Sequence, residues 1–202
     1  MTLPRHALAL LLLPACGGDG VSGPAPPAGA MRFAAITTGY FHTCALTATG
    51  TPYCWGANEF GMLGDGTRTN RTAPVAITGV QFEGIDAGAA HTCGLGSGGG
   101  ASCWGHNDEG QLGDGTFTTR DRPVAVSGGI VFTAVSAGHA HSCGLTADGS
   151  AYCWGDDSRG QLGDGAGGAT RSTRPVRVLG ERAFTRVVAG YYASCALGTD
   201  GA

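Results

Sequence analysis

The sequence predicts an all-β fold built from repeated four-stranded sheets, the blades of a β-propeller. A unit of about 50 residues recurs through most of the 202-residue chain, and such a period indicates an array of identical supersecondary units. Each copy holds four short apolar or alternating runs, which is the strand content of one blade. The 38 glycines interrupt any stretch long enough for a helix, where each would cost about 1 kcal/mol relative to alanine.

The first 16 residues, "MTLPRHALALLLLPAC", have the layout of a secretory signal. A basic residue precedes an apolar run from Ala7 to Leu13, and a small residue precedes the end. The run is too short to span a bilayer, which takes about 20 residues. Its end, "LPAC", resembles a bacterial lipobox, which implies lipidation of Cys16 and a lipoprotein of the cell envelope, at the outer membrane or cell surface. The alternative is an ordinary secretory signal in which Cys16 has no role.

Residues 17–32 follow as a segment of glycine, proline and alanine with almost no apolar bulk. This composition is typical of a flexible tether. The propeller repeats then occupy residues 33–202.

Four copies of the repeat begin at Phe33, Phe82, Phe132 and Phe184, and they predict units 33–81, 82–131 and 132–183 and a partial unit 184–202. The third copy has two extra residues between its "LGDG" and "PV" motifs, and an insertion that leaves the flanking pattern intact marks a surface loop. The fourth copy stops in the turn of its cysteine hairpin, at Asp200 and Gly201. We therefore expect an open ring of about three and a half blades and a fragment of a longer natural product.

Each of the first three copies carries two cysteines ten residues apart, with a glycine just past their midpoint. A three-residue hairpin loop that ends on this glycine, in the left-handed conformation, places the two cysteines opposite each other. Facing Cα atoms lie about 4.5–5.5 Å apart, which a disulfide accepts. The predicted pairs are Cys44 with Cys54, Cys93 with Cys103, and Cys143 with Cys153.

Zinc binding and free core thiols are the alternatives for these cysteines. Zinc sites usually contain a close C-x-x-C pair, which this sequence lacks, and an export signal favours disulfides. Cys195 in the partial copy has no cysteine ten residues further on within the sequence. We expect it to be unpaired by truncation.

Three segments resemble the regulator of chromosome condensation repeat family, namely "AGAAHTCGL" at 87–95, "AGHAHSCGL" at 137–145 and "NDEGQLGDG" at 107–115. The resemblance implies a seven-bladed β-propeller. Members include a nuclear guanine-nucleotide exchange factor that binds chromatin, a plant UV-B photoreceptor and a secreted bacterial inhibitor of β-lactamase. The fold is therefore a binding platform, and the fold alone does not select the partner.

Several motifs that suggest chemistry have a structural interpretation in this pattern. "GLGSGG" at Gly94 falls in a hairpin and opens no helix, so it does not predict a dinucleotide site. The "LGDG" aspartates lack the spacing of a calcium loop and predict turns. His139, His141 and Cys143 share one face of a strand, but Cys143 is assigned to a disulfide. We predict no catalytic residue, no metal site and no cofactor.

Residues that occur once per blade are spread around a ring and do not gather at one site. We expect the recurring histidines to form structural hydrogen bonds between strands and the recurring tryptophans to pack the blades. The structural set comprises Gly39, His42, Trp55, Gly88, His91, Trp104, Gly138, His141 and Trp154.

One slot differs between copies, namely the two residues that follow the recurring glycine. It holds Tyr40 and Phe41, then two alanines, then His139 and an alanine, and finally Tyr191 and Tyr192. In the photoreceptor that this chain resembles, the slot faces the partner, and exposed aromatic side chains are good interface anchors. These five residues are the candidate protein contacts. The alternative is that they pack on a neighbouring blade.

The predicted function is an exported, lipid-anchored binding module for a protein or peptide, with the membrane reached only through the lipid. A guanine-nucleotide exchange factor is the alternative by family analogy, and a propeller enzyme is a distant third. Nucleic acid is not expected as a partner, because net charge is −3 and nucleic-acid binders show a basic excess. Five arginines between residues 171 and 186 are interpreted as a solvated loop.

Overall fold

The computed structural model describes residues 31–166, 170–180 and 182–201. All of the regular elements in these residues are β-strands. The first blade comprises β1 (Ala35–Thr38), β2 (His42–Leu46), β3 (Pro52–Gly56) and β4 (Arg71–Ala76). The second comprises β5 (Gly84–Ala87), β6 (His91–Leu95), β7 (Ala101–Gly105) and β8 (Arg120–Ala125). The third comprises β9 (Phe132–Ala137), β10 (His141–Thr146), β11 (Ala151–Asp156) and β12 (Arg171–Arg177), and a hairpin of β13 (Phe184–Ala189) and β14 (Ser194–Gly198) follows.

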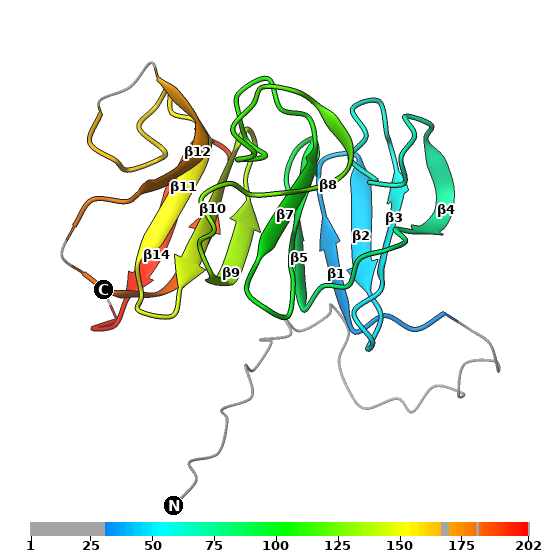
Figure 1. Cartoon of the computed structure of the whole chain (residues 1–202), viewed down its shortest axis with the longest axis horizontal. Helices are drawn as coiled ribbons and strands as arrows, with labels where there is room; N and C mark the ends of the chain where they lie inside the picture. Colours follow the sequence, from blue (N-terminus) through cyan, green and yellow to red (C-terminus); the bar gives the residue numbers. More distant parts are fainter. Residues whose placement is uncertain (1–30, 167–169, 181, 202) are drawn as a thin grey trace, which may run out of the picture. The chain divides into compact units, whose positions relative to one another are not determined.

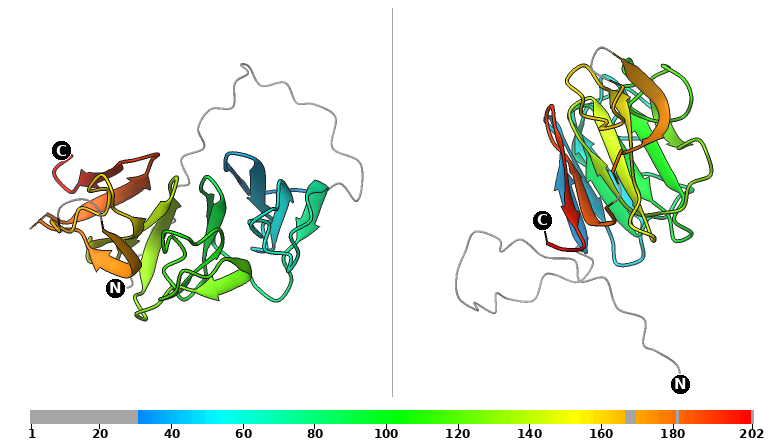
Figure 2. Two further views of the ribbon diagram at one scale, coloured as in Figure 1. Left: turned by 90° about the horizontal axis from the view of Figure 1, so that it is seen from above. Right: turned by 90° about the vertical axis from the view of Figure 1, so that its left-hand side faces the viewer.

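Each blade is an antiparallel meander in which consecutive strands pair. The first strands of the blades, β1, β5, β9 and β13, contact one another in turn. Figure 2 (left) shows the blades side by side in an arc that follows the order of the sequence. Figure 1 shows the same order from the side, with the chain reversing at both ends of every blade. The prediction of propeller blades, three complete and one partial, is therefore confirmed.

The hairpin between the second and third strands of each blade has the predicted register. Cys44 faces Cys54, Cys93 faces Cys103 and Cys143 faces Cys153. All three pairs form disulfides, with Cα atoms 4.0–4.1 Å apart. The loops end on Gly50, Gly99 and Gly149, whose φ angles of 81°, 74° and 81° lie in the left-handed region that glycine adopts at no steric cost.

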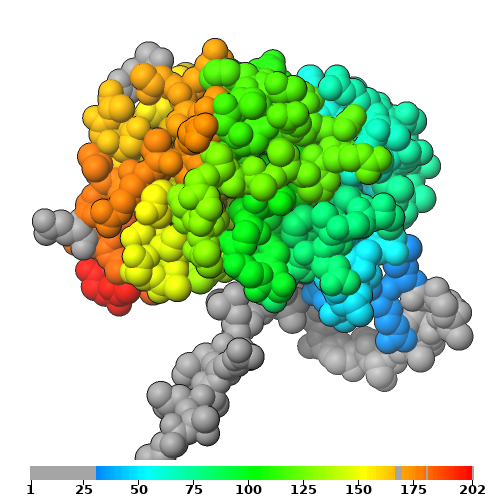
Figure 3. All heavy atoms as spheres, in the orientation of Figure 1, coloured from blue at the N-terminus to red at the C-terminus, as the bar shows by residue number. Residues whose placement is uncertain are grey.

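The hydrophobic cores lie between blades. Phe82 and Trp104 of the second blade stack with ring centroids 5.7 Å apart and pack with Leu46, Leu63 and Ile77 of the first. Phe132 and Trp154 repeat this arrangement one blade further on. Because each blade completes the core of its neighbour, the blades form a continuous body, as the space-filling view in Figure 3 shows.

Trp104 and Trp154 are fully buried and donate from Nε1 to the carbonyl oxygens of Met62 and Gln111 in the preceding blade. Trp55 is half-buried and stacks on Phe33. The tryptophans therefore pack the blades.

The interpretation of the arginine-rich segment as a loop is wrong. Arg171, Arg174 and Arg177 belong to β12, and Arg186 belongs to β13. Strand pairing with β11 decides this, because β12 occupies the outer-strand position that the repeat requires. Its outward side chains stay exposed, which explains their polar character.

The signal segment 1–16 with Cys16 and nearly all of the tether lie outside the described residues, as do residues 167–169 in the lengthened loop. In the part of the chain that the structure describes, no helix is long and apolar enough to cross a membrane.

Candidate functional site

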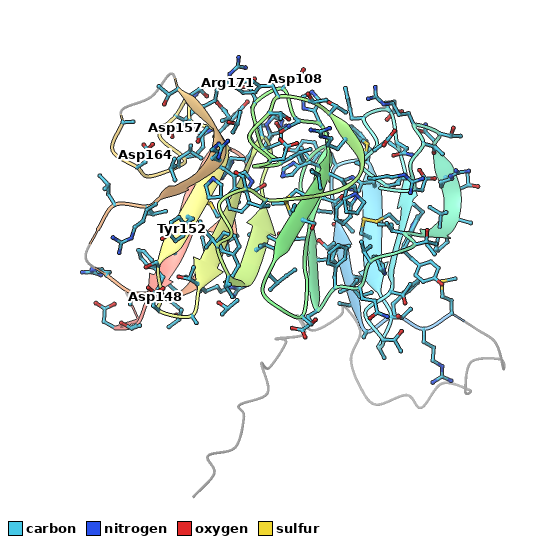
Figure 4. All side chains as sticks on the ribbon, in the orientation of Figure 1. Asp108, Asp148, Tyr152, Asp157, Asp164 and Arg171 are labelled. Atoms are coloured by element: carbon cyan, nitrogen blue, oxygen red, sulfur yellow. A yellow bond between two sulfur atoms is a disulfide. The ribbon has the colours of Figure 1, made fainter. Side chains whose placement is uncertain are left out.

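The variable slot lies at one end of every blade. It connects the first strand to the second, while the loop from the third strand to the fourth lies at the same end because the strands alternate in direction. We call this end the slot face. In Figure 4 it carries the labelled Asp108 and Arg171, whereas Asp148, in a cysteine hairpin, lies at the opposite end.

The five slot residues predicted as contacts meet on this face. The Tyr40 ring lies 5.7 Å from His139 and 5.9 Å from Tyr191, measured between centroids. His139 stacks on Tyr191 at 4.2 Å, and Tyr191 contacts Tyr192 edge-on at 4.1 Å. Phe41 lies 6.3 Å from Tyr40. We refer to these five residues as the aromatic cluster, which is built from the first, third and fourth copies.

The aromatic cluster is both packed and exposed. Phe41 is 75% exposed and Tyr40 is 51% exposed, although both rings pack within the cluster. A hydrogen bond with Tyr191 raises the pKa of Tyr192. Rings that are already held in place lose little conformational freedom on binding, which favours them as interface anchors.

A hollow of about 790 Å³ adjoins the cluster, and residues of all four copies line it. Ala89 and Ala90 of the second blade line it where the other slots carry larger rings. Phe60 and His106 form a second pair of rings in its lining, with centroids 4.6 Å apart. The small side chains of the second slot leave this part of the hollow open.

Four charged side chains also line this hollow, and three of them have polar partners. Arg171 donates to the Asp108 carbonyl oxygen at 2.9 Å and pairs with Glu109 at 3.4 Å. The Asp156 carboxylate accepts hydrogen bonds from Ser158 and Gln161. The fourth, the Arg159 guanidinium, lies 5.2 Å from the centroid of the Tyr192 ring.

The position of Arg171 follows from a difference between the copies that the sequence analysis missed. Arg71 and Arg120 begin the outer strands of the first two blades and bind Asp65 and Asp114. Partial burial raises the pKa of these carboxyls, but hydrogen bonds from a threonine and the arginine outweigh it and hold the pKa below its ordinary value. In the third blade Ser172 takes the equivalent position opposite Gly155, so Arg171 reaches the second blade instead.

The recurring histidines link neighbouring blades. His42 Nε2 lies 2.9 Å from Thr92 Oγ1, and His141 Nε2 lies 3.0 Å from Ser194 Oγ. Burial lowers the pKa of His42 and His141 to about 4, so both rings are neutral at pH 7. A neutral, buried ring that is shared between two blades has a structural role.

The close approach of neighbouring blades beside these histidines also requires the recurring glycines. A Cβ atom on Gly39 would lie 2.3 Å from the Gly88 carbonyl oxygen of the next blade and 2.4 Å from the His42 ring. Gly88 and Gly138 have the same surroundings one blade further on. Only glycine lets the next blade approach this closely.

Asp86 is a further residue that the sequence analysis missed. It lies on β5 and accepts hydrogen bonds from Thr37 Oγ1 of the first blade at 2.9 Å and from Ser136 Oγ and the Ala137 amide of the third at 3.1 and 2.9 Å. One carboxylate thus joins three blades along the inner strands. No repeated motif marks this position, because the equivalent residues are Thr37, Ser136 and Val188.

Among residues 31–166, 170–180 and 182–201 there is no group of three or more histidine, cysteine, aspartate or glutamate side chains arranged to hold a metal ion. The "GLGSGG" motif runs from the end of β6 into its hairpin turn. The predicted contact residues come together on one face, whereas the recurring histidines are distributed between blades.

A family model described as "Regulator of chromosome condensation (RCC1) repeat" matches residues 49–95, 99–145 and 148–197. A second model of the same description matches 33–61, 82–111 and 132–161. Together these matches cover well over half of the chain.

Solved structures show the same fold. Human WBSCR16 is 20% identical with a TM-score of 0.76, over 84% of this chain and 46% of that one. Prp20p from Saccharomyces cerevisiae, described with its binding properties to Gsp1p and histones, is 24% identical with a TM-score of 0.72, over 84% and 44%. The receptor kinase CR4 ectodomain from Physcomitrella patens is 29% identical with a TM-score of 0.54, over 83% and 35%. The chain spans less than half the length of these proteins.

Proposed function

The chain belongs to the regulator of chromosome condensation repeat family, and from this membership we propose that it is an exported binding protein for a protein or peptide ligand. The ligand contacts the slot face through the aromatic cluster. One observation carries the proposal: slot residues from three different copies converge into a single patch of half-exposed rings. Large exposed aromatic patches on soluble proteins mark interaction sites.

Protein binding agrees with the similar structures. Prp20p is described with binding to Gsp1p and histones, and it also appears bound to Kap60. We propose the same class of ligand for this chain, with contacts from rings that belong to its own slots. The protein acts by binding and not by catalysis.

Export is supported by two independent features. Three disulfides are typical of proteins in oxidising compartments, and the N-terminal segment has the layout of a secretory signal. We propose that Cys16 carries a lipid that anchors the protein in the cell envelope. An exchange factor for a cytosolic GTPase would not meet its partner there, which disfavours that alternative.

Site-specific photo-crosslinking in intact cells tests the proposal. Benzoylphenylalanine in place of Phe41 should give a discrete crosslinked product with a protein partner. The same probe in place of Val131, which is 62% exposed and precedes β9 at the opposite end of the blades, is the matched control. Products at Val131 but none at Phe41 would overturn the proposal.

A further inference from the structure

We propose that the ligand is an acidic peptide segment, in which a large apolar side chain enters the hollow beside the aromatic cluster and an adjacent carboxylate binds Arg159. This inference rests on the proposed function and specifies the chemistry of the ligand. It is drawn from the hydrogen-bond capacity of the groups that line the hollow.

The apolar part of the ligand is indicated by the lining. Ala89, Ala90 and Ala140 present methyl groups, while Phe60 and Tyr192 present rings that are 42% and 46% exposed. A flat or branched apolar side chain that enters this space is itself removed from water among these rings and methyl groups. Burial of apolar area at about 25 cal/mol per Å² makes such an anchor favourable.

The carboxylate is indicated by an imbalance among the charged groups. Both carboxylates in the hollow have donors beside them, because Glu109 pairs with Arg171 and Asp156 receives hydrogen bonds from Ser158 and Gln161. Arg159 instead forms no ion pair with any described residue. A basic ligand would share these carboxylates with the donors that they already bind, whereas an acidic ligand meets a guanidinium that pairs with no described carboxylate.

The placement of Arg159 suits this role. Its guanidinium lies over the Tyr192 ring at 5.2 Å, a cation–π arrangement that holds the group beside the apolar surface. A guanidinium so held can present two parallel N–H donors to a carboxylate. In a ligand that carries an aromatic or aliphatic residue next to aspartate or glutamate, the apolar side chain and the carboxylate can both reach this hollow.

Three capped dipeptides provide the probe. N-acetyl Trp-Glu amide, Trp-Gln amide and Trp-Lys amide differ only in the charge of the second residue, and each is titrated into the ¹⁵N-labelled chain while amide chemical shifts are recorded. We expect shifts at residues that line the hollow, with Trp-Glu bound about fivefold more tightly than Trp-Gln, in the range of one partly exposed ion pair. Trp-Lys should bind most weakly.

The variant Arg159→Gln should abolish the preference for Trp-Glu. Because Arg159 is exposed, the variant keeps its fold, which an unchanged spectrum outside the hollow verifies. Arg68→Gln is the control: it removes an exposed arginine from the equivalent loop of the first blade and should leave the preference intact.

Two further results separate this inference from the proposed function. Equal binding of Trp-Glu and Trp-Gln at the hollow, or a preference that survives in Arg159→Gln, overturns the acidic ligand and leaves the slot face as a binding surface. Absence of any shift on the slot face, together with absence of a crosslink at Phe41, overturns both.

Discussion

His91 Nε2 and Ser142 Oγ lie 2.8 Å apart across the boundary between the second and third blades. The Ser142 hydroxyl donates its only hydrogen to the Gln111 carbonyl oxygen at 2.9 Å. His91 must therefore donate from Nε2, which leaves its Nδ1 atom without a proton and without a hydrogen-bond partner among the described residues. This relationship ties three segments of two blades together through one neutral imidazole.

Replacement of Ser142 by alanine should destabilise the protein by about 1–3 kcal/mol, because it leaves the buried His91 Nε2 donor unsatisfied. The Gln111 carbonyl loses one of its two hydrogen bonds and keeps the one from Trp154 Nε1. Urea unfolding measures the change. Ser102→Ala, at a half-buried strand position in the same blade as His91, is the control and should stay within about 0.5 kcal/mol of the wild type. Equal losses for the two variants would contradict the role assigned to Ser142.

Stability should fall as the pH decreases below 6.5. Burial lowers the pKa of His91 to about 3 and that of His42 and His141 to about 4, from 6.5 in the unfolded chain. Between the folded and the unfolded pKa of each histidine, the unfolded chain binds more protons than the folded chain. Each histidine therefore lowers the free energy of unfolding by about 1.4 kcal/mol for every unit by which the pH falls in this range.

The measurement is urea unfolding at pH 7.5, 6 and 5. Between pH 6.5 and about 4 all three histidines contribute to the decrease, whereas the aspartates with lowered pKa contribute only at lower pH. His91→Gln, with an amide in place of the imidazole, should show a shallower slope. A stability that is flat from pH 7.5 to 5 would show that the rings accept protons in the folded state.

The three disulfides should survive as pairs within single blades. Peptide mapping without reduction should recover Cys93 with Cys103 and no bridge between blades. Cys195, which is exposed and pairs with no cysteine of the described residues, should react with a maleimide in the native protein, while the paired cysteines react only after reduction. The double variant Cys93→Ser with Cys103→Ser should lose about 3 kcal/mol of stability, and recovery of a bridge between blades would show that the register is wrong.

Loss of the aromatic cluster should affect binding more than stability. Tyr40→Ala combined with Tyr191→Ala removes two half-exposed rings, so we expect ligand capture to weaken at least about tenfold, as for interface anchors. The melting temperature should change by only a few degrees. The crosslinked product at Phe41 provides the binding readout, and a large drop in melting temperature with unchanged crosslinking would assign the cluster to packing.

Cys16→Ser tests the anchor. The wild type should incorporate a clickable fatty acid during growth, and the variant should not, because the acylated thiol is absent. Gel fluorescence and membrane fractionation give the result. An unlabelled wild type recovered from the cytosol would contradict both the lipid anchor and the export on which the proposed function rests.

The local architecture was predictable because short-range chemistry decides it. Cys44 and Cys54 are ten residues apart, and a three-residue loop ending on Gly50 leaves one register for them. The same reasoning holds for every hairpin with this glycine, so the strands and disulfides follow from the sequence of each blade alone. The prediction of a loop for the arginines of β12 was wrong. Their charge favours a loop, but the pairing of this segment with β11 makes it a strand.

Contacts between blades were not predictable in the same way, because they depend on how one sheet is rotated against the next. Asp86 joins three blades, yet nothing in the repeat pattern distinguishes it from Thr37 or Ser136. Arg171 turned toward the second blade because Ser172 took the register position of the earlier arginines.

The sequence by itself determined the repeat, the four strands of a blade, the cysteine pairs and the slot as the place where the copies differ. Only the tertiary structure decided that Tyr40 meets His139 and Tyr191, and that the two alanines of the second slot leave a hollow between larger side chains. The physical reason is the range of the forces involved. Hairpin geometry is set by torsions and hydrogen bonds over a few residues, whereas convergence of side chains about 100 and 150 residues apart is set by the packing angle between blades, which the summed contacts of their buried cores determine.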